Sequence, residues 1–158
     1  MKFIVSGSYD KTVRVWDRES GECIAILKGH EDYVLSVAIS SDMKFVVSGS
    51  IDKTIRLWDR ESGECIAILK GHKNWVNSVT ISSDMKFIVS GSDDKTIRVW
   101  DRESLECIAI LKGHEQSVIS VAISSDMKFV ISGSYDKTIR LWDRVSGECL
   151  AILKGHQD

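Results

Sequence analysis

The sequence predicts an all-β fold built from four copies of one short unit, and three observations support this. The first is a 42-residue spacing between equivalent residues, which the cysteines illustrate: Cys23, Cys65, Cys107 and Cys149. The second is an alternation of polar and apolar residues with the period of a half-buried strand. The third is the lack of any stretch of about 12 residues with helical periodicity. Such internal repetition is typical of solenoids, propellers and other repeat architectures.

Each unit contains four predicted strands separated by polar turns. In the second unit these strands occupy residues 44–49, 54–58, 64–69 and 76–81. The segment from Thr54 to Trp58 alternates polar and apolar residues most clearly, and the turn that follows it is rich in charged residues. The pattern therefore predicts one small antiparallel sheet for each 42 residues.

The chain divides into units 1–42, 43–84, 85–126 and 127–158, of which the last is incomplete. The first and second units differ at nine positions, and the second and third also differ at nine. The first unit has no counterpart of strand 34–39 before it. We therefore expect fifteen strands rather than sixteen.

Composition excludes several classes of protein. The 158 residues include 21 basic and 23 acidic side chains, for a net charge of -2, and 43% are hydrophobic. These values argue against a disordered polyelectrolyte, a membrane-spanning protein and a nucleic-acid binder that depends on bulk positive charge. The apolar run at the N-terminus is too short for a signal peptide, so a cytoplasmic location is expected, with no nucleic-acid or membrane partner.

The repeated Gly-His and Trp-Asp pairs carry a resemblance to a known family. They occur at Gly29-His30 and Trp58-Asp59 and recur in the next two units, in register with Ser-Gly-Ser-x-Asp-Lys-Thr and Leu-Lys-Gly-His. This pattern resembles the WD40 family, in which each unit forms a four-stranded blade of a β-propeller. The resemblance covers the whole chain and implies four blades, the first lacking its innermost strand. The loop 40–42 departs from the family, because many members carry a proline there.

The resemblance also implies a hydrogen-bonded tetrad of His, Ser, Asp and Trp in each blade. The carboxylate would hold the imidazole, the imidazole would bond the hydroxyl, and the hydroxyl would accept the indole N–H. A buried polar network of this kind stabilises one register only when it is complete. The expected tetrads are His30, Ser48, Asp52 and Trp58; His72, Ser90, Asp94 and Trp100; and His114, Ser132, Asp136 and Trp142.

A Ser-His-Asp hydrolase site is the alternative interpretation of the same residues. Catalysis needs one polarised site, whereas this set of residues recurs in every unit, so the structural interpretation is favoured. A serine-reactive phosphonate would test the alternative.

The two ends of the array are incomplete in complementary ways. Ser6, Asp10 and Trp16 have no preceding histidine, and His156 has no following Ser, Asp or Trp. WD40-like propellers typically close with about seven or eight blades, and terminal repeats expose apolar faces. We therefore expect two chains to form an eight-bladed ring, with His156 of each chain completing the tetrad of the other. The alternatives are that the chain is a piece of a longer repeat array, or a fragment cut from such an array.

The positions that vary between units predict a binding face. In the family these positions surround the mouth of the central channel, where partners commonly bind. They include every tyrosine and the only tryptophan outside the Trp-Asp pairs, and large aromatic residues are common at interface hot spots. The predicted face consists of Tyr9, Tyr33, Leu35, Ile51, Trp75, Asn77, Asp93, Ser117, Ile119 and Tyr135. The alternative is neutral drift of loop tips after duplication.

The favoured function is a non-enzymatic scaffold that binds a protein or peptide and requires no cofactor or metal. A multivalent lectin is the first alternative, but it would need the same residues at equivalent sites, and these differ. The second alternative is a recently amplified or engineered repeat without a specific ligand.

Four further features concern single positions in the repeat. The cysteines lie in apolar strands without C-x-x-C spacing and are expected to be reduced and partly buried. Cys23 and His30 do not have the spacing of metal ligands. One arginine per unit, beginning with Arg14, is expected on a solvated face. Leu105 replaces a glycine found at three equivalent positions, which would be unfavourable if that turn needs a positive φ.

Overall fold

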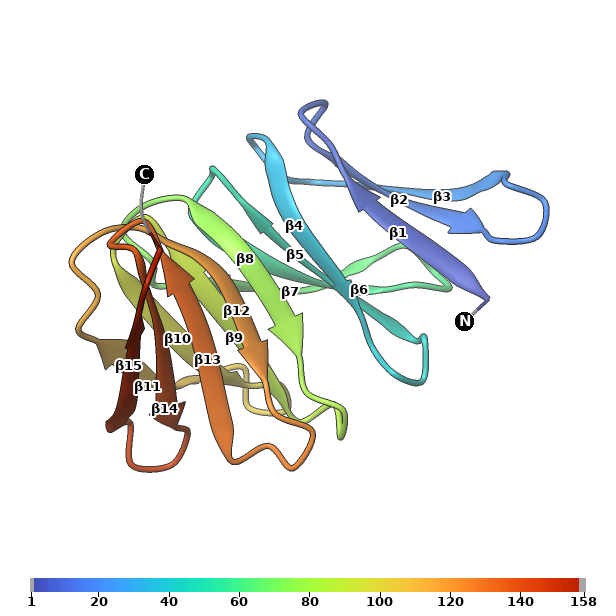
Figure 1. Cartoon of the computed structure of the whole chain (residues 1–158). Coiled ribbons are helices and arrows are strands. Elements are labelled where there is room, and N and C mark those ends of the chain that lie inside the picture. Colours follow the sequence, from blue (N-terminus) through green and yellow to red (C-terminus); the bar gives the residue numbers. More distant parts are fainter. Residues whose placement is uncertain (1, 157–158) are drawn as a thin grey trace.

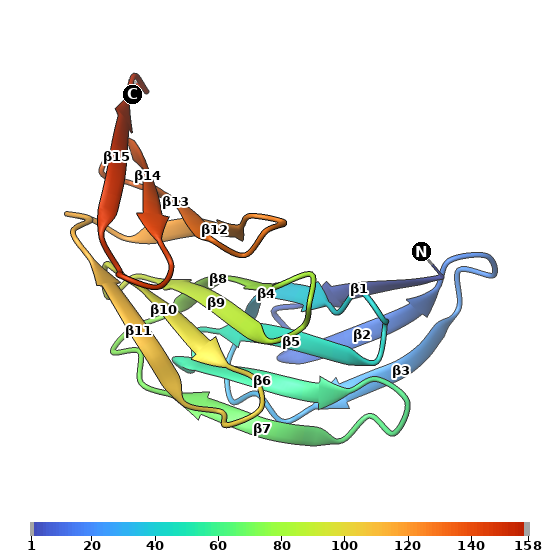
Figure 2. The same cartoon turned by 90° about the horizontal axis from the view of Figure 1, so that it is seen from below.

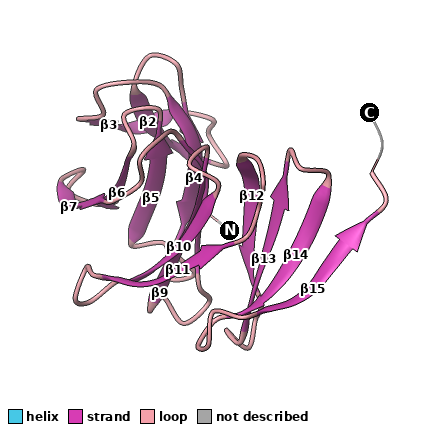
Figure 3. Ribbon diagram, turned by 90° about the vertical axis from the view of Figure 1, so that its left-hand side faces the viewer, coloured by secondary structure: helices cyan, strands magenta, loops and turns pink. Residues whose placement is uncertain are grey.

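The computed structural model describes residues 2–156 and contains four antiparallel sheets in sequence order along the chain (Figure 1). Strands and loops account for the whole described range, which contains no helix (Figure 3). We refer to the sheets as the first to fourth blades. All-β architecture, four blades and fifteen strands are thus confirmed.

The blades follow the repeat, and equivalent strands differ by whole multiples of 42 residues. The first blade comprises β1 (Phe3–Gly7), β2 (Thr12–Asp17) and β3 (Cys23–Lys28). The second comprises β4 (Val34–Ile39), β5 (Phe45–Ser50), β6 (Thr54–Asp59) and β7 (Cys65–Lys70). The third comprises β8 (Val76–Ile81), β9 (Phe87–Ser92), β10 (Thr96–Asp101) and β11 (Cys107–Lys112). The fourth comprises β12 (Val118–Ile123), β13 (Phe129–Ser134), β14 (Thr138–Asp143) and β15 (Cys149–Lys154).

Each complete blade begins with an innermost strand, β4, β8 or β12, and these three strands pack side by side. The first blade has three strands, so β1 lies at an edge where the other blades have a paired strand. The four blades form a row with the first and fourth at opposite ends (Figure 1 and Figure 2).

The hydrophobic core lies between blades rather than within them. One cluster joins Leu57 and Leu69 of the second blade to Val76 and Trp100 of the third. Equivalent clusters join the first blade to the second and the third to the fourth. A two-sided sheet can bury both faces only if it has a neighbour on each side, as in other repeat proteins. The strand alternation inferred from the sequence therefore corresponds to packing between blades.

The two outer faces of the row lack such a neighbour. Leu153 in the fourth blade is 57% exposed, whereas the equivalent Leu27, Leu69 and Leu111 are at most 3% exposed. Ile4 of the first blade is exposed as well, whereas the equivalent Val46 and Ile88 are fully buried. Identical or similar side chains thus differ in burial only because of their place in the row.

The turn after each Trp-Asp pair requires a left-handed residue. The carboxylate of Asp101 accepts hydrogen bonds from the backbone N–H groups of Glu103 and Ser104, and its carbonyl accepts one from Leu105. Leu105 has a φ of 63°, close to the 72° to 75° of the three equivalent glycines. Leucine is unfavourable in this region because its Cβ clashes with the backbone. The turn therefore meets the condition under which Leu105 destabilises the protein.

Candidate functional site

Each complete blade contains a hydrogen-bonded chain of Trp, Ser, His and Asp. In the second blade the indole Nε1–H of Trp58 donates to Ser48 Oγ at 2.8 Å. Ser48 Oγ lies 2.7 Å from His30 Nε2, and His30 Nδ1 lies 2.6 Å from Asp52 Oδ2. The third and fourth blades repeat these three contacts within 0.1 Å. These hydrogen bonds join the loop before the innermost strand to the second and third strands of the blade.

The donors and acceptors of this network can be assigned without conflict, with Nδ1 of the imidazole as donor and Nε2 as acceptor. Because Ser48 accepts the indole N–H, its own hydroxyl hydrogen is free to donate to Nε2 of His30. The Nδ1–H of the imidazole then donates to Asp52. Asp52 also accepts bonds from the backbone of Glu31 and from the backbone and hydroxyl of Thr54. Both carboxylate oxygens are therefore saturated.

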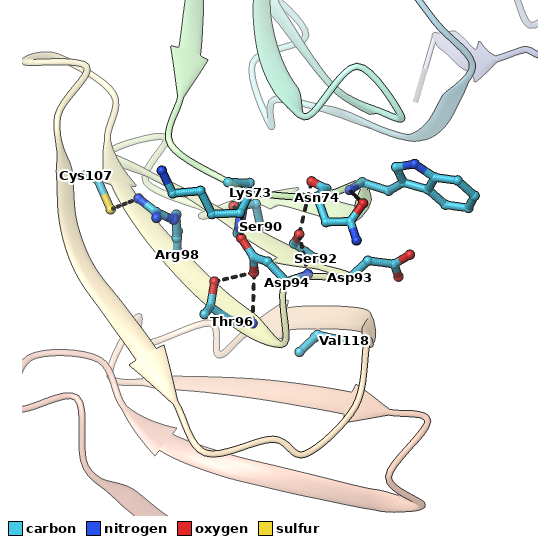
Figure 4. A network of polar contacts seen from close by, with 12 residues as sticks. Lys73, Asn74, Ser90, Ser92, Asp93, Asp94, Thr96, Arg98, Cys107 and Val118 are labelled. Carbon is cyan, nitrogen blue, oxygen red and sulfur yellow. Dashed lines mark hydrogen bonds and ion pairs between the residues drawn. The ribbon is translucent and has the colours of Figure 1, made fainter.

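The network lowers the pKa of the three tetrad aspartates well below the ordinary value. Burial by itself raises the pKa of Asp94, but hydrogen bonds from His72, Thr96 and the backbone of Lys73 outweigh it. Asp52 and Asp136 are shifted in the same direction for the same reasons. Figure 4 shows Asp94 held by Thr96 beneath Lys73. Each tetrad therefore contains an ionised carboxylate over the whole neutral range.

The tetrad serine is not placed as a nucleophile would be. Ser48, Ser90 and Ser132 are at most 1% exposed, and each accepts the tryptophan N–H as well as contacting the histidine. A substrate carbonyl would need to reach the serine oxygen, and the core packing prevents this. The burial of this oxygen and its two existing contacts fit a structural hydrogen-bond network better than a nucleophile.

The first blade has only part of a tetrad. Trp16 Nε1 donates to Ser6 Oγ at 2.9 Å, as in the other blades. Asp10 Oδ2, the oxygen that takes the histidine elsewhere, lies 3.4 Å from an Nη atom of Arg14. His156 lies at the far end of the row and lines a cavity of about 440 Å³ on the fourth blade. Within one chain, His156 is thus not brought to Ser6, Asp10 and Trp16.

The repeated arginines are half-buried, and the prediction that they lie on a solvated face is wrong for three of the four. Arg56, Arg98 and Arg140 lie about 6 Å from the tetrad tryptophan of their blade, and their Nε atoms are buried. The glycine of the Gly-His pair provides the space, because a Cβ at Gly29 would lie 2.6 Å from Arg56 Nη1. The sequence does not reveal this contact, since 27 residues separate its partners.

Four aromatic side chains of the predicted binding face are exposed. Tyr9 and Tyr135 are 70% and 63% exposed, and Trp75 and Tyr33 are 44% and 40% exposed. Tyr9 of the first blade stacks on Tyr33 of the second, with ring centroids 4.6 Å apart and planes 14° apart. We call Tyr9, Tyr33, Trp75 and Tyr135 the aromatic rim. A stacked pair that bridges two blades presents a larger flat surface than either ring alone.

The other residues of the predicted face are less available. Asn77 donates from Nδ2 to Asp93 Oδ1 at 2.6 Å and to the carbonyl of Val118 at 3.0 Å. These two bonds use both amide hydrogens and link the third blade to the fourth. Figure 4 labels Asp93 and Val118, the two residues that accept these bonds. Leu35, Ile51 and Ser117 are half-buried, and Ile119 is exposed on the outer face of the fourth blade.

The cysteines are free thiols, but the prediction that they are partly buried is wrong for three of them. Cys23, Cys65 and Cys149 are exposed, and only Cys107 is half-buried. They open the outermost strand of each blade, which has no strand beyond it. Within residues 2–156, no three His, Cys, Asp or Glu side chains are grouped as metal ligands. A helix able to span a bilayer is not found in the described part of the chain.

Comparison with known proteins identifies matches along the repeats. The family model of the WD40 repeat (WD domain, G-beta repeat) matches residues 1–17, 21–59, 63–101 and 105–143. Nuclear distribution protein PAC1 of Mycosarcoma maydis is 46% identical over 39 residues, which is 25% of this chain and 9% of that protein. Cell division control protein 4 of Candida albicans is 60% identical over 37 residues, which is 23% of this chain and 5% of that protein. The aligned segments are thus about one repeat long and cover less than a tenth of either relative.

Proposed function

Because the chain belongs to the WD40 repeat family, whose members are generally non-enzymatic scaffolds that bind protein partners, we propose that it binds a protein or peptide through the aromatic rim. The observation that carries this proposal is the exposure of four large aromatic side chains at the variable loop positions. Aromatic rings bury a large area for little loss of side-chain entropy, and they dominate many interfaces. A catalytic role is not proposed, since the tetrad hydroxyls are buried.

Alanine substitution of the rim tests this proposal. Trp75→Ala combined with Tyr33→Ala removes two exposed rings, so partner capture in a pull-down should be lost while the melting temperature changes little. Val145→Ala is a matched control, because Val145 is 80% exposed and lies in the loop between β14 and β15. Retained capture by the double variant, or a large loss of stability, would contradict a binding role for these rings.

We also propose that two chains assemble into an eight-bladed ring. The outer faces of the first and fourth blades both expose apolar side chains that are buried elsewhere in the row. The incomplete tetrad supports the same pairing, because Asp10 lacks a histidine and His156 lacks its Ser, Asp and Trp. In this ring, His156 of each chain would replace Arg14 at Asp10 of the other.

Light scattering tests the ring directly. The expected species at micromolar concentration is a dimer, twice the 17.7 kDa of one chain. His156→Ala should shift the equilibrium toward monomers, because Asp10 and Ser6 would remain without their partner in the junction. His30→Ala is a poor control, since it disrupts a complete tetrad, so Lys154→Ala at the exposed end of β15 is preferable. A monomer at all accessible concentrations contradicts the ring.

A further inference from the structure

The outer face of the fourth blade carries an open groove. In each of the other three blades the equivalent groove is filled. The open groove encloses about 290 Å³ and is lined by residues that include Ile119, Ser120, Ile131, Gly133 and Ile139. In the first three blades this position is covered by the innermost strand of the following blade. The fourth blade has no following blade in the described chain.

Glycine marks the floor of the groove in every blade. A Cβ at Gly49 would lie 2.7 Å from Val76 and 2.9 Å from Val79 of β8. A Cβ at Gly91 would meet Val118 and Val121 of β12 at nearly the same distances, and a Cβ at Gly7 would meet Val34 at 2.6 Å. A Cβ at Gly133 would find only Ser120 of its own blade, at 3.8 Å. The hollow above Gly133 therefore has the position that valine side chains occupy elsewhere.

A hydrogen bond repeats along the same row. Ser36 Oγ of β4 accepts the backbone N–H of Val79 in β8 at 3.0 Å. Ser78 Oγ of β8 likewise accepts the N–H of Val121 in β12 at 3.2 Å. The next serine in this series is Ser120 of β12, which is exposed and lines the groove. Its hydroxyl is placed to accept the corresponding N–H of an added strand.

We propose that this groove binds an extended segment of a partner protein with the pattern Val-x-Ser-Val, seated as β8 and β12 are seated on their neighbours. The two valines fill the hollow above Gly133, and the N–H of the second valine donates to Ser120 Oγ. A bulge after the first valine, as between Val76 and Ser78, directs both valines to the same side. The three copies of this pattern in the described chain already occupy their own blades, and the proposed occupant is a further copy carried by a partner protein.

The groove contains no residue of the aromatic rim, although His156, which the proposed ring places at Asp10 of the other chain, also lines it. All of its residues belong to one chain. If the ring forms, the blade that adjoins the groove is a first blade, which lacks an innermost strand. The groove would therefore remain vacant in the ring as well.

The experiment is a titration of the intact chain with a fluorescently labelled peptide that has the sequence of residues 34–42, followed by fluorescence anisotropy. Saturable binding is expected. A peptide with aspartate at both valine positions should bind at least tenfold more weakly, because charged side chains cannot enter an apolar hollow without loss of hydration. Absence of saturable binding by the parent peptide would overturn the proposal.

Two variants of the protein locate the bound peptide. Gly133→Val fills the hollow and should weaken binding at least tenfold, while its fold is preserved because a Cβ at this position makes only an ordinary contact with Ser120, at 3.8 Å. Ser120→Ala should weaken binding about threefold through loss of one hydrogen bond. Circular dichroism and thermal melting confirm folding of both variants. Binding unchanged by both variants would place the peptide elsewhere and overturn the proposal.

A control separates this inference from the proposed function. Trp75→Ala alters the aromatic rim but not the groove, so it should leave peptide affinity unchanged. If Trp75→Ala abolishes peptide binding, the peptide occupies the rim and the groove proposal is wrong. Loss of partner capture by the rim variant, with peptide binding retained, supports both proposals independently.

Discussion

At the scale of single residues, most side chains in the repeat have one role that recurs in each blade, and the exceptions affect stability. Leu105 is the clearest exception, because it occupies a left-handed position that three glycines occupy elsewhere. Leu105 is 38% exposed, so burial offsets the backbone strain only in part. The tetrad aspartates are the opposite case, since every hydrogen bond to them is repeated in three blades.

Replacing Leu105 by glycine should stabilise the protein by about 1 kcal/mol, since the strain of a non-glycine residue at positive φ is removed. Denaturant unfolding measures the change. Gly63→Leu is the matched reverse substitution, because it places the same residue at the equivalent position of the second blade. It should destabilise by a similar amount. Equal stability of all three proteins would show that this turn tolerates leucine.

The tetrads predict a loss of stability in acid. The pKa of Asp94 is lowered in the folded state, so its contribution is complete above the unfolded pKa of about 3.9 and is lost as the pH falls below that value. Asp94→Asn should lower the free energy of unfolding at pH 7 and weaken its dependence on pH between about 4 and 2. Chemical denaturation at a series of pH values measures both effects.

At the scale of strands, the sequence was sufficient to locate every element to within one residue. Strand 54–58 was predicted, and β6 spans Thr54–Asp59. The alternation corresponds to burial, because Ile55 and Leu57 are buried whereas Thr54 and Arg56 are half-buried. Contacts between strands distant in sequence could not be predicted, such as Arg102 of the third blade stacking on Phe45 of the second at 4.9 Å. The left-handed conformations of Lys53 and Met85 were also missed, because neither residue type indicates positive φ.

The glycine on the second strand of each blade provides a matched pair of substitutions. Gly49→Ala places a Cβ within 3 Å of two valines of the next blade and should destabilise by about 1–3 kcal/mol through overpacking. Gly133→Ala meets nothing closer than 3.8 Å and should change stability by less than about 0.5 kcal/mol. Thermal and denaturant unfolding compare the two. Similar losses at both positions would show that the glycine is needed for the backbone rather than for packing between blades.

At the scale of the whole molecule, burial depends on a blade's position in the row. On the outer faces of the two end blades, residues are exposed whose equivalents in the middle blades are buried, although the sequences are nearly the same. In an array stabilised by contacts between neighbours, a terminal blade has one stabilising interface and a middle blade has two. The sequence of the repeat does not reveal this difference, because position in the row is a property of the assembled chain. Local unfolding should therefore begin at the ends.

Hydrogen exchange measures that order directly. In dilute protein, amides of β2 and β14 should exchange faster than those of β6 and β10, since the outer blades open with a smaller loss of buried area. If two chains form the proposed ring, raising the concentration covers the end faces and should slow exchange in β2 and β14 but not in β6 or β10. His156→Ala should reduce that concentration dependence. Uniform exchange along the chain at every concentration would contradict both the unequal stability of the blades and the association of their end faces.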